Sequence, residues 1–284
     1  MKRIGNLYEK ICSIENLQLA DEKARKGKLR TYGVLEHDKN REANLLKLRE
    51  TLLNGTFHTS KYDVFTIYEP KEREIYRLPY FPDRILHHAI MNVLEPIWVS
   101  TFTADTYSCI KNRGIHAAAK KVKQALREDP EGTTFCLKLD IRKFYPSINH
   151  DVLKSILRRK LKDKRLLRLL DEIIDSADGV PIGNYLSQYF ANLYLTYFDH
   201  WIKEQKRVKH YFRYADDIVI LASDKSYLHS LMGEIRAYLG DLKLEVKGNW
   251  QVFPVAARGI DFVGYVFFHT HTRMRKGIKK TFCR

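Results

Sequence analysis

The stretch that decides the fold runs from residue 214 to residue 221 and reads YADDIVIL. Two adjacent carboxylates, Asp216 and Asp217, stand between apolar runs, although neither strand propensity nor like-charge repulsion favours them there. A second apolar run, FCLKL, ends on Asp140 in the same way. The Asp pair alone also fits a polar hairpin tip. If the two strands are neighbours, however, Asp140 and Asp216 converge at one edge of a sheet.

Converging carboxylates point to metal chemistry. Mg²⁺ is a hard cation that prefers oxygen ligands, and two such ions about 4 Å apart activate a hydroxyl and stabilise a leaving phosphate oxygen. The 284-residue chain carries 50 Lys and Arg against 34 Asp and Glu, a net charge of +16. Such a surplus favours a polyanionic partner, either nucleic acid or an anionic membrane surface. An acidic cluster within a basic chain fits phosphoryl transfer on nucleic acid.

Apolar periodicity on both sides of these strands predicts an α+β fold. Asn149 is expected to cap a helix, and Asn54-Gly55 and Gly240 to end two others. The order of elements predicts an antiparallel sheet with helices on one face. We expect helices over 41–53, 83–99, 149–157, 164–175, 186–201 and 228–239, a strand pair over 61–80 split by Glu69-Pro70, a hairpin over 211–222, and strands over 134–139, 242–247, 250–255 and 260–268.

Several classes of protein are excluded by the sequence. Residues 1–10 contain no apolar segment that would act as a signal peptide. No apolar run approaches the roughly 18 residues that a membrane helix needs, so no membrane partner is expected. The four cysteines include no C-x-x-C pair, which argues against a zinc ribbon or a disulfide framework. We therefore expect a reduced, cytoplasmic protein.

Three segments of the chain carry a family resemblance. They read LKLDIRKFY (137–145), IGNYLSQ (182–188) and YADD (214–217). In this order and spacing the chain resembles the reverse transcriptases from about residue 62 to residue 268, and Arg73 and Lys247 also stand at family positions. Any one segment is modest evidence, but the ordered set is specific.

The resemblance implies a right-hand polymerase with fingers and palm, in which an antiparallel palm sheet is backed by helices. We expect an N-terminal helical extension over 1–60, fingers over 61–135, and a palm over 136–268 with a fingers-type helical insertion around 150–180. A basic tail over 269–284 would be the start of a thumb. Because only about 16 residues follow Phe268, we expect the thumb to be truncated or absent.

The resemblance also implies a catalytic set whose carboxylates hold two Mg²⁺ ions, for which Mn²⁺ can substitute. Lys247 would stand near the phosphates as an acid for the leaving pyrophosphate, with a plain surface lysine as the alternative. The set comprises Asp140, Asp216, Asp217 and Lys247, and Ile141 joins the three aspartates among the metal-binding residues.

A nucleotide-binding set and a primer grip follow from the same resemblance. Tyr145 would lie beneath the sugar and exclude a 2′-hydroxyl, which implies DNA synthesis; the alternative is a core tyrosine. Arg73 would fold over the base and phosphates, with a solvated strand charge as the alternative. The other nucleotide-binding residues are Ile141, Ile182, Gly183, Ser187, Gln188 and Ala215, and the primer grip comprises Phe262, Gly264 and Tyr265.

Two motifs depart from the common family pattern. Most reverse transcriptases carry Gln-Gly before the long helix and Ser-Pro at its start, where this chain has Ile182-Gly183 and Ser187-Gln188. The variant resembles the reverse transcriptases of diversity-generating retroelements, which copy a template-repeat RNA with errors at adenines. Ile182 cannot hydrogen-bond the nucleotide as Gln would, so it is expected to lower fidelity, unless it serves only in packing.

The expected partners are an RNA template, a DNA or RNA primer, dNTPs and, by resemblance, a small basic accessory variability protein. A group II intron-like or defence-associated reverse transcriptase is the alternative within the family, and a non-catalytic RNA-binding protein is the alternative from another class. Basic residues gather around 111–123, 154–168 and 273–284. We expect these three groups to follow phosphate backbones in a salt-dependent way rather than to form plain solvated faces.

Overall fold

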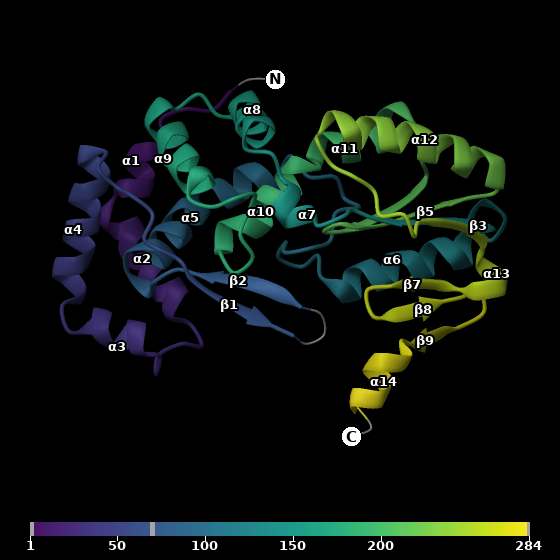
Figure 1. Ribbon diagram of the computed structural model, residues 1–284, viewed down its shortest axis with the longest axis horizontal. Coiled ribbons are helices and arrows are strands. Elements are labelled where there is room, and N and C mark those ends of the chain that lie inside the picture. Colours follow the sequence, from purple (N-terminus) through teal and green to yellow (C-terminus); the bar gives the residue numbers. More distant parts are fainter. Residues whose placement is uncertain (1–2, 69–71, 283–284) are drawn as a thin grey trace. The chain divides into compact units, whose positions relative to one another are not determined.

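The chain folds into two compact units, each assembled from two separate stretches of sequence (Figure 1). The computed structural model describes residues 3–68 and 72–282, so the expected break at Glu69-Pro70 lies outside the described residues. Unit 1 comprises residues 1–101 and 148–194, and unit 2 comprises residues 102–147 and 195–284. Within the described part of the chain, no helix combines the length and apolar character needed to span a bilayer.

Unit 1 is built mainly from helices. Two expected helix ends are confirmed, because Oδ1 of Asn149 accepts from the backbone N of Val152 at 3.1 Å and Gly55, at φ 68°, follows α4. The third is off by one residue, because Gly240 lies within a helix that continues to Asp241. The elements are α1 (Tyr8–Cys12), α2 (Ile14–Arg25), α3 (Tyr32–Asp38), α4 (Arg41–Asn54), β1 (Asp63–Ile67), β2 (Arg73–Arg77), η1 (Tyr80–Arg84), α5 (Ile85–Val99), α8 (His150–Lys160), α9 (Lys164–Asp175) and α10 (Tyr185–Tyr194).

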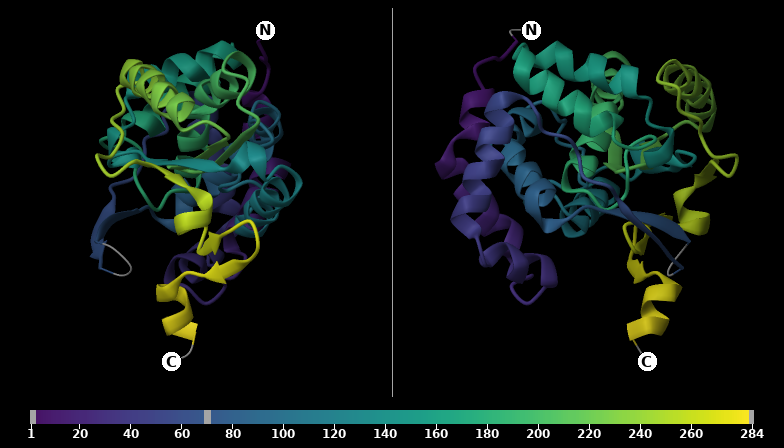
Figure 2. Two further views of the ribbon diagram at one scale, coloured as in Figure 1. Left: turned by 90° about the vertical axis from the view of Figure 1, so that its right-hand side faces the viewer. Right: turned by 60° about the vertical axis from the view of Figure 1, so that its left-hand side comes forward.

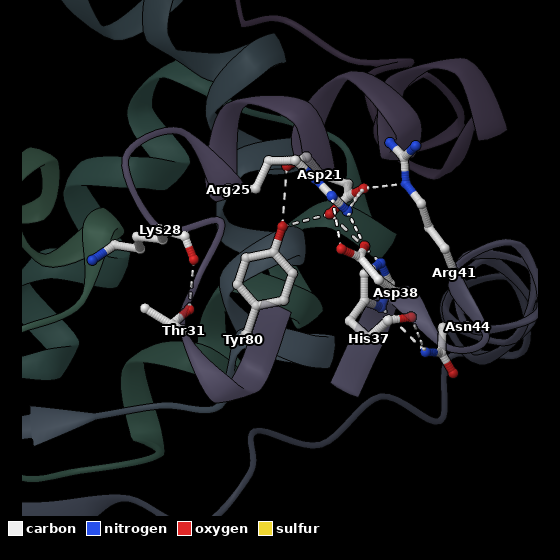
Figure 3. Close-up of polar contacts among 9 residues, drawn as sticks. All are labelled: Asp21, Arg25, Lys28, Thr31, His37, Asp38, Arg41, Asn44 and Tyr80. Atoms are coloured by element: carbon white, nitrogen blue, oxygen red, sulfur yellow. Dashed lines mark hydrogen bonds and ion pairs between the residues drawn. The ribbon is translucent and has the colours of Figure 1, made fainter. Parts of the chain in front are cut away.

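A fully buried carboxylate, Asp21 of α2, ties the N-terminal helices of unit 1 together (Figure 3). Its oxygens accept hydrogen bonds from Arg25 at 2.8 Å, from Arg41 of α4 at 2.6 Å and from the hydroxyl of Tyr80 in η1. Burial alone would raise the pKa of Asp21, but these donors outweigh it and lower the pKa below its usual value. The buried charge is therefore compensated, and it links α2 to α4 and η1.

Unit 2 centres on a four-stranded antiparallel sheet in the order β4–β5–β3–β6, with a smaller sheet in the order β7–β8–β9. The large sheet consists of β3 (Phe135–Asp140), the expected hairpin β4 (His210–Tyr214) and β5 (Asp217–Ala222), and β6 (Gln251–Pro254). The other elements are α6 (Ile115–Glu128), η2 (Glu131–Thr133), α7 (Phe144–Ser147), α11 (Thr196–His200), η3 (Trp201–Gln205), α12 (Lys225–Asp241), α13 (Val255–Arg258), β7 (Ile260–Phe262), β8 (Tyr265–Phe267), β9 (Thr272–Met274) and α14 (Lys276–Phe282).

Both faces of the large sheet are covered. On one face Cys136 of β3 and Val219 of β5 share a core cluster with Val122 of α6 and Phe262 of β7. The opposite face packs against α12, and both views of Figure 2 keep α12, in yellow-green, apart from the yellow β7–β9 segment. The expectation of helices on one face is wrong, because side chains alternate along a strand and here both sets are apolar.

Three expected elements differ in the structure. The helix over 186–201 is interrupted at Leu195 (φ −95°, ψ 1°), so α10 and α11 are separate. Residues 242–247, all within the described part, form only an isolated bridge between Val246 and Ile141, because Lys243 turns the chain at φ 60°. Residues 260–268 form the hairpin β7–β8 rather than one strand. Its two-residue turn is Val263-Gly264, with φ values of 44° and 89°.

Candidate active site

The two carboxylate-bearing strands lie side by side, as their sequences predict. β3 pairs with β5 so that Asp140 is directly opposite Asp217. Tyr214 pairs with Asp217 across the β4–β5 hairpin, which leaves Ala215 and Asp216 as its two-residue loop. Ala215 has φ 55°, a left-handed conformation that non-glycine residues rarely adopt. Such local strain persists only where surrounding contacts hold it in place.

Asp216 and Asp140 interact directly at this end of the sheet. Burial raises the pKa of Asp216 to about 6, and the charge of Asp140 and a hydrogen bond between the two carboxyl groups add to the rise. Burial also raises the pKa of Asp217. Two carboxylates in contact resist ionising together, so a cation placed between them would be favoured.

Two lysines neutralise neighbouring carboxylate oxygens. Nζ of Lys247 lies 2.7 Å from Oδ1 of Asp140, and its backbone N donates to the backbone O of Asp140 at 2.9 Å. Lys138 forms an ion pair with Asp217, and its Nζ lies 5.0 Å from the centroid of the Phe262 ring. Lys247 is among the predicted residues, whereas Lys138 is not. The sequence feature that would have identified Lys138 is its position two residues before Asp140, which places both side chains on the same face of the strand.

The donor atoms suit a hard cation. Asp140 and Asp216 present carboxylate oxygens together, the donor type that Mg²⁺ and Mn²⁺ prefer. Asp217 is engaged by Lys138 instead. Within residues 3–68 and 72–282, no three His, Cys, Asp or Glu side chains are grouped to hold one metal ion. The structure therefore brings Asp140 and Asp216 into contact as a donor pair, and Asp217 lies beside them, opposite Asp140 in the sheet.

A buried ion pair that the sequence does not reveal supports the Asp216 loop. Arg213 is fully buried and binds Asp199 of α11 with two bonds, Nε–Oδ1 at 2.7 Å and Nη2–Oδ2 at 2.6 Å. Its third nitrogen, Nη1, donates to the carbonyl of Ala215 at 3.0 Å. Tyr211 and Thr106 donate to the same carboxylate at 2.6 and 3.0 Å. The only hint in the sequence is a charged residue within the otherwise apolar strand YFRY.

The predicted residues after β3 stay close to the carboxylates. The side chain of Ile141 is fully buried. Tyr145 is half-buried and lies edge-on to Phe144, with ring centroids 5.6 Å apart. Burial raises the pKa of Tyr145, with smaller contributions from Cys109 and Asp216, so its hydroxyl lies within electrostatic reach of the carboxylate loop.

The predicted primer grip is the tip of the β7–β8 hairpin. Phe262 pairs with Tyr265, and Phe262 is fully buried whereas Tyr265 is half-buried. Gly264 adopts φ 89° and its carbonyl accepts from the backbone N of Arg275 at 3.0 Å. A Cβ on Gly264 would lie 2.8 Å from Cδ1 of Ile278, the end of a side chain, so the conformation rather than space is what favours glycine here.

The remaining predicted residues belong to unit 1. The carbonyl of Ile182 accepts from the backbone N of Tyr76 in β2 at 2.8 Å, which fixes the 182–183 loop to the β1–β2 hairpin. Gly183 has φ 122°, and a Cβ there would lie only 2.7 Å from the carbonyl oxygen of Tyr76. The others are Arg73, exposed at the start of β2, and Ser187 and Gln188 of α10, which are buried and exposed, respectively.

Comparisons with known proteins agree with this geometry. A sequence model of the family "Reverse transcriptase (RNA-dependent DNA polymerase)" matches residues 69–267. Protein YkfC of Escherichia coli is 26% identical over 274 residues, covering 80% of this chain and 71% of that protein. The group II intron-encoded protein LtrA of Lactococcus lactis is 24% identical over 191 residues, covering 62% of this chain and 31% of LtrA. The chain therefore spans about a third of LtrA.

Solved structures show the same fold. The telomerase of Candida tropicalis, in complex with the TWJ fragment of telomeric RNA, superposes with a TM-score of 0.56 at 14% identity and covers 77% of this chain and 45% of that one. The telomerase of Candida albicans, also with the TWJ fragment, gives a TM-score of 0.54 at 13% identity over 79% and 48% of the two chains. The predicted right-hand architecture with fingers and palm is thereby confirmed.

Proposed function

This chain belongs to the reverse transcriptase (RNA-dependent DNA polymerase) family, and on that premise we propose that it copies an RNA template into DNA at the Asp140–Asp216 pair. The observation that carries the proposal is the meeting of these carboxylates where β3 and the β4–β5 loop lie together. A protein that only bound RNA would gain nothing from acidic groups facing phosphate, since they would repel it.

The proposed chemistry is the attack of a primer 3′-hydroxyl on the α-phosphate of a dNTP, with release of pyrophosphate. Divalent ions held by Asp140 and Asp216 would activate the hydroxyl and stabilise the leaving oxygen, and Mg²⁺ fits the oxygen donors. Lys247, whose Nζ lies 2.7 Å from Oδ1 of Asp140, would stand near the leaving group and supply it with a proton.

The other site residues receive their roles by proposal. Tyr145, near Asp216, would pack beneath the sugar and disfavour a 2′-hydroxyl. The β7–β8 tip would hold the primer end, and Arg73 and the 182–188 segment would contact the nucleotide. We propose unit 2 as the palm and the β1–β2 hairpin of unit 1 as part of the fingers, with template RNA, primer and dNTPs as partners.

Primer extension on an RNA template, with Mg²⁺ and dNTPs, tests this function. Asp216→Asn keeps the shape but removes the charge, so extension should fall about 100-fold or more, the scale of losing one charge-stabilising group. Asp241→Asn, at the exposed end of α12, is the matched control and should extend like the parent. Equal extension by Asp216→Asn and the parent would reject the active-site assignment and favour a non-catalytic RNA-binding protein.

For the type of retroelement, we propose a diversity-generating element with error-prone copying of adenines. The support is Ile182, whose backbone is fixed by Tyr76 while its half-buried apolar side chain replaces a hydrogen-bonding Gln. A basic accessory protein would then be a partner. Sequencing cDNA from Ile182→Gln and the parent tests this type, and adenine errors at the parental rate would remove it. The similarity to LtrA favours a group II intron-like type as the second candidate.

A further inference from the structure

Unit 2 contains a hollow of about 1180 Å³, lined by α6 and by the segment that joins β8 to β9. Figure 1 shows α6 on the same side of the large sheet as the β7–β9 sheet, and α6 contacts β8. All residues that line the hollow lie in the described part of the chain, and none of them is Asp or Glu. We call this hollow the α6 groove.

One wall of the α6 groove is a row of cationic and imidazole side chains. His116, Lys120, Lys123 and Arg127 all line it, and their spacing of four, three and four residues places them along one stripe of the helix. Lys120 and Lys123 are exposed, and neither side chain makes an ion pair or hydrogen bond with another described residue. At about 1.5 Å per residue, the row spans about 16 Å.

The same helix is apolar on its other side, so the row cannot turn away from the groove. Ala118, Val122 and Leu126 are buried in the core cluster of unit 2. Because this side is packed against the sheet, the helix is fixed about its axis and the lysines are held toward solvent. Their charge is thus presented on a rigid element rather than on a mobile tail.

The opposite wall offers flat rings. Phe268 and His271 stack with centroids 4.6 Å apart and an interplanar angle of 11°, and the guanidinium of Arg273 lies 5.3 Å from the Phe268 centroid. His271 is exposed, and Tyr265 and His269 also line the groove. Cations facing aromatic rings across a groove are the pattern of proteins that follow a single nucleic-acid strand, since bases stack on rings and phosphates meet lysines.

We propose that the α6 groove binds single-stranded RNA, with the α6 row holding roughly three or four consecutive phosphates and the Phe268–His271 pair stacking a base. The choice of RNA over other strands rests on the proposed function, because an RNA template is the strand that such an enzyme must hold. The groove shares Tyr265 with the proposed primer grip, but its α6 row is separate in sequence from the Asp140–Asp216 pair, and it would hold a part of the RNA that is not being copied.

Fluorescence anisotropy tests the α6 groove without any polymerisation. A labelled 20-nucleotide oligo(U) RNA is titrated with the full chain at several salt concentrations, with EDTA and without dNTPs. Lys120→Gln/Lys123→Gln should weaken binding about tenfold and make the slope of log K against log salt shallower by about 1.4, since each phosphate contact on a single strand contributes about 0.7. A double-stranded RNA of the same length should show no such dependence.

A matched variant removes two equally exposed charges elsewhere in unit 2, Lys225→Gln/Lys243→Gln, neither of which lines the groove. It should keep the parental affinity and slope. Parental binding by the groove variant, or an equal loss in both variants or on the duplex, would overturn the proposal. Primer extension by the same proteins is scored separately. If the parent does not extend primers but the groove variant has the shallower salt slope, the groove proposal stands and the polymerase proposal is rejected. If the parent extends primers but the groove variant keeps the parental slope, the polymerase proposal stands and the groove proposal is rejected.

Discussion

Replacing Arg213 by Met should destabilise unit 2 strongly, because Arg213 and its partner Asp199 are both fully buried. Met has a similar length but no charge, so Asp199 would remain fully buried with only Tyr211 and Thr106 as neutral donors. Removing one partner of a buried ion pair costs about 3–5 kcal/mol. Arg213→Lys retains the charge but loses the bidentate contact with Asp199, so we expect a smaller loss of unfolding free energy, about 1–3 kcal/mol.

Urea-induced unfolding followed by circular dichroism measures these losses, and amide hydrogen exchange of peptides from residues 210–222 shows whether they are local. The double variant Arg213→Met/Asp199→Leu should be less destabilised than the sum of its single changes, because no buried charge is left unpaired. Lys203→Gln is the control. Lys203 contacts Asp105 at 3.1 Å with both side chains partly exposed, and its loss should cost less than about 1 kcal/mol.

The Arg213 contact should also affect catalysis beyond stability. Its Nη1 bond holds the carbonyl of Ala215, which occupies a strained left-handed conformation immediately before Asp216. Arg213→Lys, assayed where it is fully folded, should lower the rate of primer extension about tenfold with little change in the KM for dNTP, since a misplaced carboxylate affects the chemical step. Exact additivity of the double variant, or a folded Arg213→Lys with the parental rate, would refute this reasoning.

Two further predictions concern unit 1. Gly183→Ala should lower the free energy of urea unfolding by about 1–3 kcal/mol, because at φ 122° the new Cβ would meet the carbonyl oxygen of Tyr76. The control Gly233→Ala lies in α12 of unit 2, where a Cβ has open space, and should raise the free energy of unfolding by about 0.5–1 kcal/mol; equal effects of the two changes would contradict the clash. Burial lowers the pKa of His87 to about 3, so the unfolded chain binds its proton first as pH falls below 6.5, and stability should drop by about 2 kcal/mol by pH 5. His87→Leu should remove that part of the drop, which thermal unfolding at pH 7 and pH 5 measures; an unchanged drop would show that His87 titrates normally.

Local signals in the sequence were sufficient for most elements and for the carboxylate pair. The helix α4 ends at Gly55 and the helix α8 begins after Asn149, because glycine and capping side chains act within one turn of the chain. The convergence of Asp140 and Asp216 followed from two apolar strands that each end on a carboxylate. The length and polarity of each strand can be recognised from the local sequence, and the antiparallel pairing could be inferred from them.

Features that depend on distant neighbours could not be predicted in this way. The interruption at Leu195 has no glycine or proline to mark it, and Asp199, which binds Arg213, lies in the helix that follows it. The pairing of that buried charge joins residues 14 positions apart on different elements. Likewise, the chain passes from one unit to the other after residues 101, 147 and 194, a division that composition does not reveal.

The balance of charge explains why so basic a chain keeps its carboxylates together. Lys138 and Lys247 pair with Asp217 and Asp140, whereas Asp216 has no ion-pair partner among the described residues. In a chain of net charge +16, a phosphate backbone is drawn toward the basic surfaces and is repelled locally at the cluster. The repulsion between the carboxylates and phosphate would fall when further cations enter, so the proposed site suits a substrate that arrives together with divalent ions. If the proposed function holds, attraction of the nucleic acid to the basic surfaces and a need for cations at the carboxylates are therefore two consequences of one charge distribution.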